Sequence, residues 1–123
     1  MTLIDTSSWI EALRKSGNQE VRERVRTLLV NGNAAWCDMI RLELWNGTSG
    51  QAETEMLRRL ERDLPSLEIT AEVWKTACSL ARQARAAGMT VPSTDLLIVA
   101  CARHHNASLE HVDRHFDLVS RIS

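Results

Sequence analysis

Residues 2–8, with the sequence TLIDTSS, decide the fold, because a short apolar run is followed at once by an acid and a helix start. The run 2–4 predicts a buried strand that stops at Asp5. The hydroxyl residues after Asp5 are good N-caps, and they open a predicted helix that continues to about Lys15. A strand that passes directly into a helix is typical of an α/β unit.

The same alternation continues along the chain. Short apolar runs at 34–37, 67–69 and 107–112 predict three more strands. Helical patterns lie between them, and Gly47 is expected to close the helix over 39–46 in a left-handed conformation. The helix over 95–102 is apolar nearly all round and is therefore expected to be buried. Strands separated by helices predict a three-layer α/β/α sandwich with a mostly parallel sheet of about four strands.

Composition limits the class of protein. The chain has 123 residues, of which 44% are hydrophobic and 25% charged, which suits a single domain spanning 1–123. Its net charge of −1 argues against a domain that grips nucleic acid through bulk positive charge. The sequence has no apolar run long enough for a membrane span, no signal-peptide pattern and an odd number of cysteines. A cytoplasmic location is therefore predicted.

Four acids are placed where α/β proteins bind ligands. Asp5 and Asp113 follow the first and last predicted strands, Glu43 lies on the helix after the second strand, and Asp95 opens the buried helix. Because ligands bind outside the carboxyl ends of parallel strands, these side chains are expected to meet at one edge of the sheet.

Each acid alone has a simpler explanation, since Asp is a common helix cap and is favoured in a first helical turn. Four carboxylates in one pocket would repel one another unless cations neutralise them. Sites made of oxygen ligands suit hard cations such as Mg²⁺ or Mn²⁺. Two such ions can stabilise the attacking and leaving oxygens of a displacement at phosphorus, so the pattern suggests phosphodiester hydrolysis.

Four ordered motifs then resemble the PIN-domain family, and more narrowly the VapC-type toxins of toxin–antitoxin pairs. The motifs are LIDTS at 3–7, LEL at 42–44 with Gly47, TDLLIVA at 94–100, and HVDRHF at 111–116. The resemblance covers essentially the whole chain. It implies a PIN-like fold and a Mg²⁺- or Mn²⁺-dependent endoribonuclease in which water activated by the metal cuts RNA, leaving 5′-phosphate ends. It also implies a homodimer that is held inactive by a cognate VapB-like antitoxin.

The resemblance assigns catalytic and metal-binding roles to Asp5, Glu43, Asp95 and Asp113, with Glu43 either a ligand or the residue that positions water. Other polar residues near the motifs are expected to have lesser roles. Three hydroxyl residues, Thr6, Ser7 and Thr94, could orient a carboxylate or water, but helix capping is their favoured role. Structural roles or minor RNA contacts are favoured for His111 and His115.

Two other functions remain open at this point. An inert PIN-like module would use its acidic pocket to bind a basic partner segment, for example through an inserted Arg. An aspartyl-phosphate enzyme would use Asp5 as the nucleophile, although the second Asp common in such enzymes is missing. Surplus apolar residues at 51–64 and 71–87 further suggest a groove for an antitoxin helix.

Overall fold

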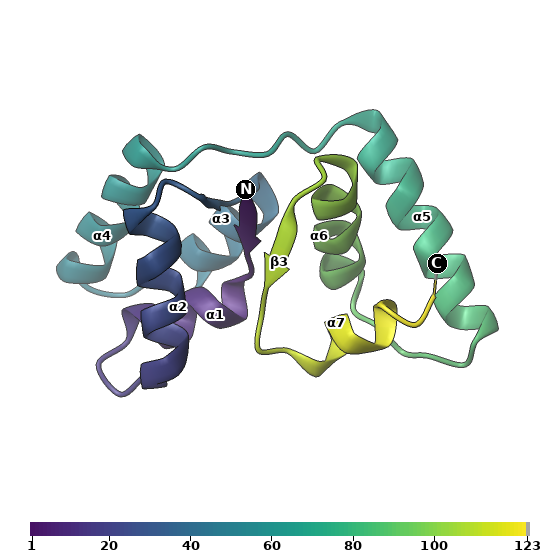
Figure 1. Ribbon diagram of the computed structural model, residues 1–123, viewed down its shortest axis with the longest axis horizontal. Coiled ribbons are helices and arrows are strands. Elements are labelled where there is room, and N and C mark those ends of the chain that lie inside the picture. Colours follow the sequence, from purple (N-terminus) through teal and green to yellow (C-terminus); the bar gives the residue numbers. More distant parts are fainter. Residues whose placement is uncertain (123) are drawn as a thin grey trace.

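A parallel three-stranded sheet forms the centre of the protein in a computed structural model that describes residues 1–122 (Figure 1). Its strand order is β2-β1-β3, with β1 at Thr2–Ile4, β2 at Ala34–Ala35 and β3 at Ser108–Glu110. Leu3 pairs with Ala35 on one side and with Leu109 on the other. Helices flank the sheet, as predicted for an α/β sandwich.

The helices follow the predicted order closely. Their bounds are Thr6–Leu13 (α1), Gln19–Val30 (α2), Asp38–Asn46 (α3), Gln51–Asp63 (α4), Ala71–Ala86 (α5), Ser93–His104 (α6) and Arg114–Val119 (α7). Figure 1 shows α1 and α2 on one side of the sheet and α5 and α6 on the other. None of the helices in residues 1–122 is both long and apolar enough to cross a membrane.

Burial explains the central elements. Leu3 and Ile4 of β1 are fully buried, and α6 is buried at every position from Asp95 to Ala102, as its apolar sequence predicts. These elements share one hydrophobic core with the other strands and helices. The assignment of all of 1–123 to one domain stays a prediction, since Ser123 lies outside the described residues.

The sheet has three strands in residues 1–122, so the prediction of about four was wrong in number. The segment 67–69 forms no strand. The preceding Ser66 makes one parallel bridge to Trp36, and the Leu67 N–H donates to the Trp36 carbonyl at 2.8 Å. The ladder ends there because α3 begins at Asp38, so only the cap residue Cys37 is still extended beyond Trp36.

The predicted left-handed Gly47 was also wrong. Its φ is −98°, and its N–H donates to the carbonyls of Glu43 and Leu44 at 3.2 Å each. The Thr48 hydroxyl covers the Leu44 carbonyl at 2.7 Å, so the end of α3 is satisfied without a left-handed residue.

Candidate active site

The fold brings the four predicted acids to one end of the sheet. Asp5 follows β1, Asp113 follows β3, and both strands run toward the end where α1 and α7 begin (Figure 1). Asp95 lies in the first turn of α6 and Glu43 in the middle of α3. Helices from both sides of the sheet therefore supply the remaining two carboxylates.

Asp95 lies at the electrostatic centre of this group. Burial raises the pKa of its carboxyl to about 6, and the nearby charges of Asp113, Asp5 and Glu43 push in the same direction. Asp95 is 8% exposed, and its Oδ2 is buried without a hydrogen-bond partner. A buried acceptor without a partner is costly, which indicates a position prepared for a cation or another donor.

Asp5 is fixed by its own helix. It is 4% exposed, caps α1, and its Oδ2 accepts hydrogen bonds from the Ser7 N–H at 3.0 Å and the Ser7 hydroxyl at 2.6 Å. The favoured capping role of Ser7 was therefore wrong, because Asp5 is the cap, and the alternative prediction that Ser7 orients a carboxylate is confirmed. Because these two hydrogen bonds hold Oδ2, the carboxylate of Asp5 cannot rotate freely, and the direction of Oδ1 is fixed as well.

Glu43 is held across the pocket by Thr6, whose hydroxyl donates to Oε1 of Glu43 at 2.9 Å. Thr6 is the first residue of α1 and not its cap, so its predicted capping role was wrong as well. Burial raises the pKa of the Glu43 carboxyl, the Thr6 hydrogen bond lowers it, and the charge of Asp5 raises it again, with a net rise. Pro92, and not Thr94, precedes α6 as its N-cap.

Asp113 and His115 form a pair that sequence reasoning undervalued. Oδ1 of Asp113 accepts a hydrogen bond from the backbone N–H of His115 at 2.9 Å. The same oxygen lies 2.7 Å from Nδ1 of the His115 ring. Burial raises the pKa of Asp113, but the two hydrogen bonds and the charge of His115 outweigh it, so the net pKa is lowered. The same Nδ1 lies 3.7 Å from Oδ2 of Asp95.

These three residues fit a metal ion. One donor atom from each of Asp95, Asp113 and His115 lies within 4.8 Å of the others. Neighbouring ligands in an octahedral shell of about 2.1 Å radius lie about 3 Å apart. The observed separations of 2.7 Å and 3.7 Å bracket that value. The His at 115 was visible two positions after the acid, but its contact with Asp95 depends on how α7 packs on α6.

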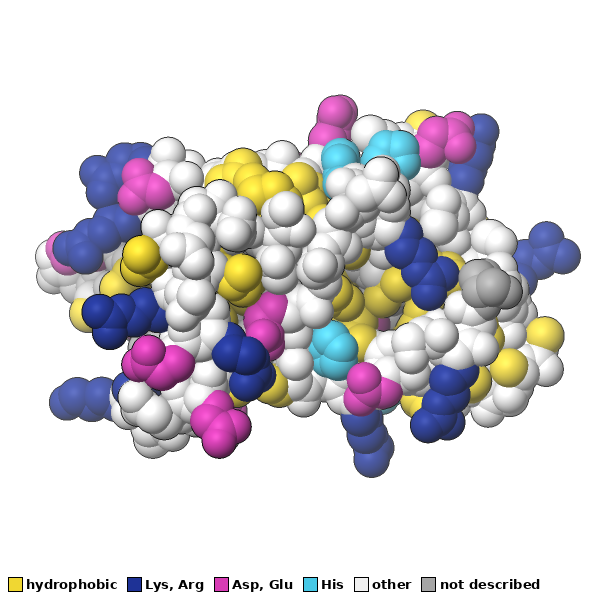
Figure 2. Space-filling model, viewed as in Figure 1, with side chains coloured by type: hydrophobic (Ala, Val, Ile, Leu, Met, Phe, Trp, Pro, Cys, Tyr) yellow, Lys and Arg dark blue, Asp and Glu magenta, His cyan; other side chains and the backbone are white. Residues whose placement is uncertain are grey.

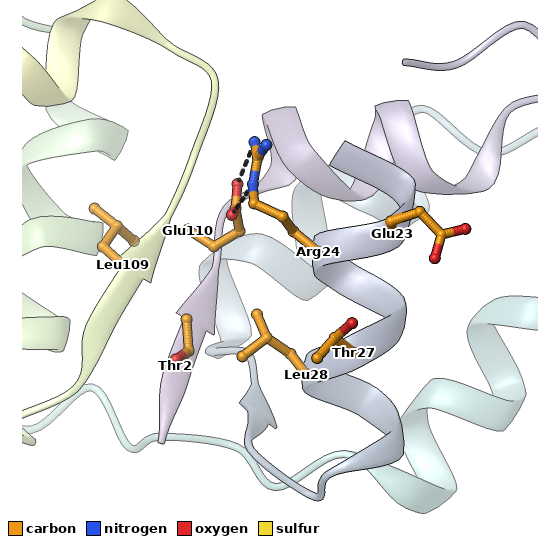
Figure 3. Close-up of a pocket in the computed structure, with 7 residues that line it drawn as sticks. All are labelled: Thr2, Glu23, Arg24, Thr27, Leu28, Leu109 and Glu110. Carbon is orange, nitrogen blue, oxygen red and sulfur yellow. Dashed lines mark hydrogen bonds and ion pairs between the residues drawn. The ribbon is translucent and has the colours of Figure 1, made fainter. Parts of the chain in front are cut away.

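Two pockets lie in the described part of the chain, and one of them shares Glu43 with the acidic site. A pocket of about 460 Å³ lies between α2 and β3, where Arg24 and Glu110 form an ion pair at 2.7 Å (Figure 3). A second, of about 440 Å³, is lined by α1, α3 and α4, and Glu43 forms part of its wall. The second pocket therefore opens beside the acids.

Basic side chains do not gather into one patch on the face shown in Figure 2. Lys and Arg residues are scattered there and alternate with acids and apolar groups. This matches the net charge of −1 and leaves the acidic site as the focus for chemistry on a charged substrate.

Comparison with known proteins identifies the family of the chain. The chain belongs to the PIN-domain family, whose model matches residues 2–122, and the predicted membership is thereby confirmed. Within that family it is similar to VapC proteins. It is 39% identical to ribonuclease VapC11 of Mycobacterium tuberculosis and to VapC ribonuclease Mb1587 of Mycobacterium bovis, over 100% of this chain and 94% of each relative.

Solved structures show the same fold. The FitAcB structure from Neisseria gonorrhoeae aligns with a TM-score of 0.78 at 21% identity, over 98% of this chain and 94% of that chain. VapBC-1 from nontypeable Haemophilus influenzae aligns with a TM-score of 0.75 at 19% identity, over 99% of this chain and 94% of that chain. At these identities the likeness supports the three-dimensional arrangement alone, and it confirms the predicted PIN-like α/β fold.

Proposed function

We propose that this protein is a divalent-metal-dependent endoribonuclease of the VapC type, the toxin of a toxin–antitoxin pair. The observation that carries the proposal is the convergence of Asp5, Glu43, Asp95 and Asp113 from four separate segments around an unpartnered buried oxygen. The relatives at 39% identity are named ribonucleases, and a structure with the same fold, VapBC-5 from Mycobacterium tuberculosis, is described as a member of the VapBC family of toxin–antitoxin systems.

Asp5, Asp95 and Asp113 would hold the metal, Mg²⁺ or Mn²⁺. When bound, such a cation activates water and neutralises the negative charge that develops on the phosphate. Neighbouring residues of the chain would hold these carboxylates in position. Ser7 would keep Asp5 in place, and the backbone N–H of His115 would do the same for Asp113.

Glu43 positions the attacking water and accepts its proton. Because the Thr6 hydroxyl donates to Oε1 of Glu43, Oε2 is the oxygen that would accept the proton of the attacking water. A carboxylate with a raised pKa is a better proton acceptor than an ordinary one, because its affinity for a proton is closer to what neutral pH requires. As the family resemblance implies, the 3′-oxygen would be the leaving group and would take a proton from solvent water, so the products would carry a 5′-phosphate and a 3′-hydroxyl.

The antitoxin would lie in the groove between α1, α3 and α4. The apolar side chains of Ile10, Leu13 and Met56 at this groove are 46%, 38% and 38% exposed, and Arg14 and Glu53 add charges to its lining. An amphipathic helix fits such a surface. Because Glu43 is part of the same wall, a segment bound there would lie directly beside the proposed active site. The homodimer implied by the family stays a prediction, which light scattering of the purified chain would test.

The decisive experiment incubates purified, antitoxin-free protein with total RNA and Mn²⁺ or Mg²⁺, and maps the ends of the products. We expect cuts with 5′-phosphate ends that EDTA abolishes. Asp5→Asn should also abolish them while leaving the fold intact, since Asn caps a helix as well as Asp does.

The matched control is Asp38→Asn, which removes an exposed carboxylate from the same helix as Glu43 and should cut RNA as the unchanged protein does. Glu43→Gln should be strongly impaired. A 2′,3′-cyclic phosphate product would contradict attack by water. If the folded protein bound metal and cut none of the RNA, the inert module that binds a basic segment would be favoured instead.

A further inference from the structure

His115 adds a nitrogen donor to an acidic site whose other donors are carboxylate oxygens. Its Nδ1 lies 2.7 Å from Oδ1 of Asp113 and 3.7 Å from Oδ2 of Asp95. The ring therefore faces two carboxylates that come from different helices, one at the start of α6 and one before α7.

The Nδ1 atom faces Asp95 as well as Asp113, and positioning Asp113 alone would not need the second contact. To position Asp113, one hydrogen bond to one of its carboxylate oxygens would be enough. The backbone N–H of His115 already donates such a bond to Oδ1 of Asp113. Oδ2 of Asp95 is instead left buried without a partner while facing the same nitrogen. A cation between the three donor atoms would satisfy all of them at once.

We propose that His115 binds the divalent cation directly through Nδ1, and that this nitrogen makes the site prefer Mn²⁺ and later transition metals to Mg²⁺. The proposal rests on the function proposed above and specifies its metal. Mg²⁺ prefers oxygen ligands alone, whereas imidazole raises affinity along the transition series.

The ring can adopt the state that ligation needs. The His115 side chain is 31% exposed, so Nε2 can carry the proton and donate it to water while the lone pair of Nδ1 faces the carboxylates. The backbone contact that begins α7 uses the N–H of residue 115 and the side chain of Asp113. Replacing the ring therefore leaves the start of this helix intact.

The test measures metal binding and its coordination, separately from activity. Metal-free protein is titrated with Mn²⁺ and with Mg²⁺, and pulsed electron paramagnetic resonance of the Mn²⁺ form detects any directly bound imidazole nitrogen. We expect a nitrogen signal in the unchanged protein. His115→Gln should lose that signal and bind Mn²⁺ at least about tenfold more weakly, with a much smaller change for Mg²⁺.

Two further variants sharpen the result. His115→Asp supplies an oxygen donor in place of the nitrogen, and it should lose the signal while shifting the preference toward Mg²⁺. His104→Gln changes an exposed histidine at the far end of α6, and it should behave as the unchanged protein does.

The proposal is overturned if the unchanged protein binds Mn²⁺ without a nitrogen signal, or binds no Mn²⁺. It is also overturned if His115→Gln weakens both metals by the same factor, because His115 would then only position Asp113. Failure of the nuclease function has a different signature: the nitrogen signal would be present and selective while no RNA is cut.

Discussion

Asp95 couples protonation to folding in the absence of metal. Its carboxyl has a pKa of about 6 in the folded state, against an ordinary value of 3.8. Between these two values the folded state binds more protons than the unfolded state, so its stability falls as the pH rises. The lowered pKa of Asp113 acts in the opposite sense, but only below its own ordinary value of 3.8.

We therefore expect the free energy of unfolding in EDTA to fall, relative to Asp95→Asn, as the pH rises from about 4 to about 6. Above that window the difference between the two proteins should stay constant. Urea unfolding at a series of pH values measures it, with Asp38→Asn as the control. Saturating Mn²⁺ should reverse the trend, because the metal binds the ionised carboxylate. A parallel pH dependence in Asp95→Asn would show that another group is responsible.

At the scale of single residues, the sequence predicted the acids better than their supports. Asp5, Asp95 and Asp113 are recognisable because each stands where a strand ends or a helix begins. Whether Thr6 and Ser7 cap the helix or hold carboxylates is not recognisable in this way. The two roles differ only by a rotation about a side-chain bond. The partner of Thr6 is Glu43, which lies 37 residues away in the sequence.

Among the secondary-structure elements, α2 is fastened to β3 by one buried carboxylate. Glu110 accepts from Arg24 at 2.7 Å (Figure 3). It also accepts from the hydroxyl of Ser8 at 2.8 Å, and Ser8 is fully buried. The Arg24 side chain is 47% exposed, whereas that of Glu110 is 11% exposed. The inner contact with Ser8 therefore has the larger energetic consequence.

Glu110→Ala should lower the free energy of unfolding by about 1–3 kcal/mol, because the Ser8 hydroxyl would remain buried without its acceptor. Arg24→Ala should cost less, since half-exposed ion pairs contribute about 1 kcal/mol or less. Glu110→Gln keeps an acceptor for Ser8 and should fall between the two. Urea denaturation of the metal-free protein measures each value. Glu23→Ala, at the rim of the same pocket, is the control, and a loss from it equal to that of Glu110→Ala would contradict the assignment.

The elements themselves were largely predictable where burial and pattern agree. The apolar run of α6 and the buried strand β1 satisfied both, and the structure places them as expected. The segment 67–69 was predicted as a strand because it is short and apolar. Strand formation also needs an extended neighbour, and α3 begins two residues after Trp36, which a local pattern in 67–69 does not reveal.

At the scale of the whole molecule, the groove between α1, α3 and α4 separates antitoxin binding from RNA cleavage. Met56→Glu places a charge in the apolar surface of the groove without touching the four acids. We expect it to weaken binding to the cognate antitoxin by at least about tenfold, since a buried unpaired charge at an interface costs several kcal/mol. The rate of RNA cleavage by the antitoxin-free protein should not change.

Isothermal titration calorimetry measures the first quantity and end-mapped RNA cleavage the second. Val30→Glu is the matched control, because Val30 is 75% exposed on α2 and outside the groove. If Met56→Glu bound the antitoxin as tightly as Val30→Glu does, the groove would not be the docking surface.

The pairing of β1 with β3 joins residues 2–4 to residues 108–110, near opposite ends of the described chain. Closing so long a loop is entropically expensive and slow compared with forming the helices between. The same closure brings Asp113 to Asp5, so we expect the acidic site to be completed late in folding, after the helices have formed. For a proposed toxin, the order of these events means that the surface for the antitoxin forms before the site that cuts RNA. Each new molecule would pass through an interval in which α1, α3 and α4 can already offer a surface to the antitoxin while the machinery for cutting RNA is still incomplete.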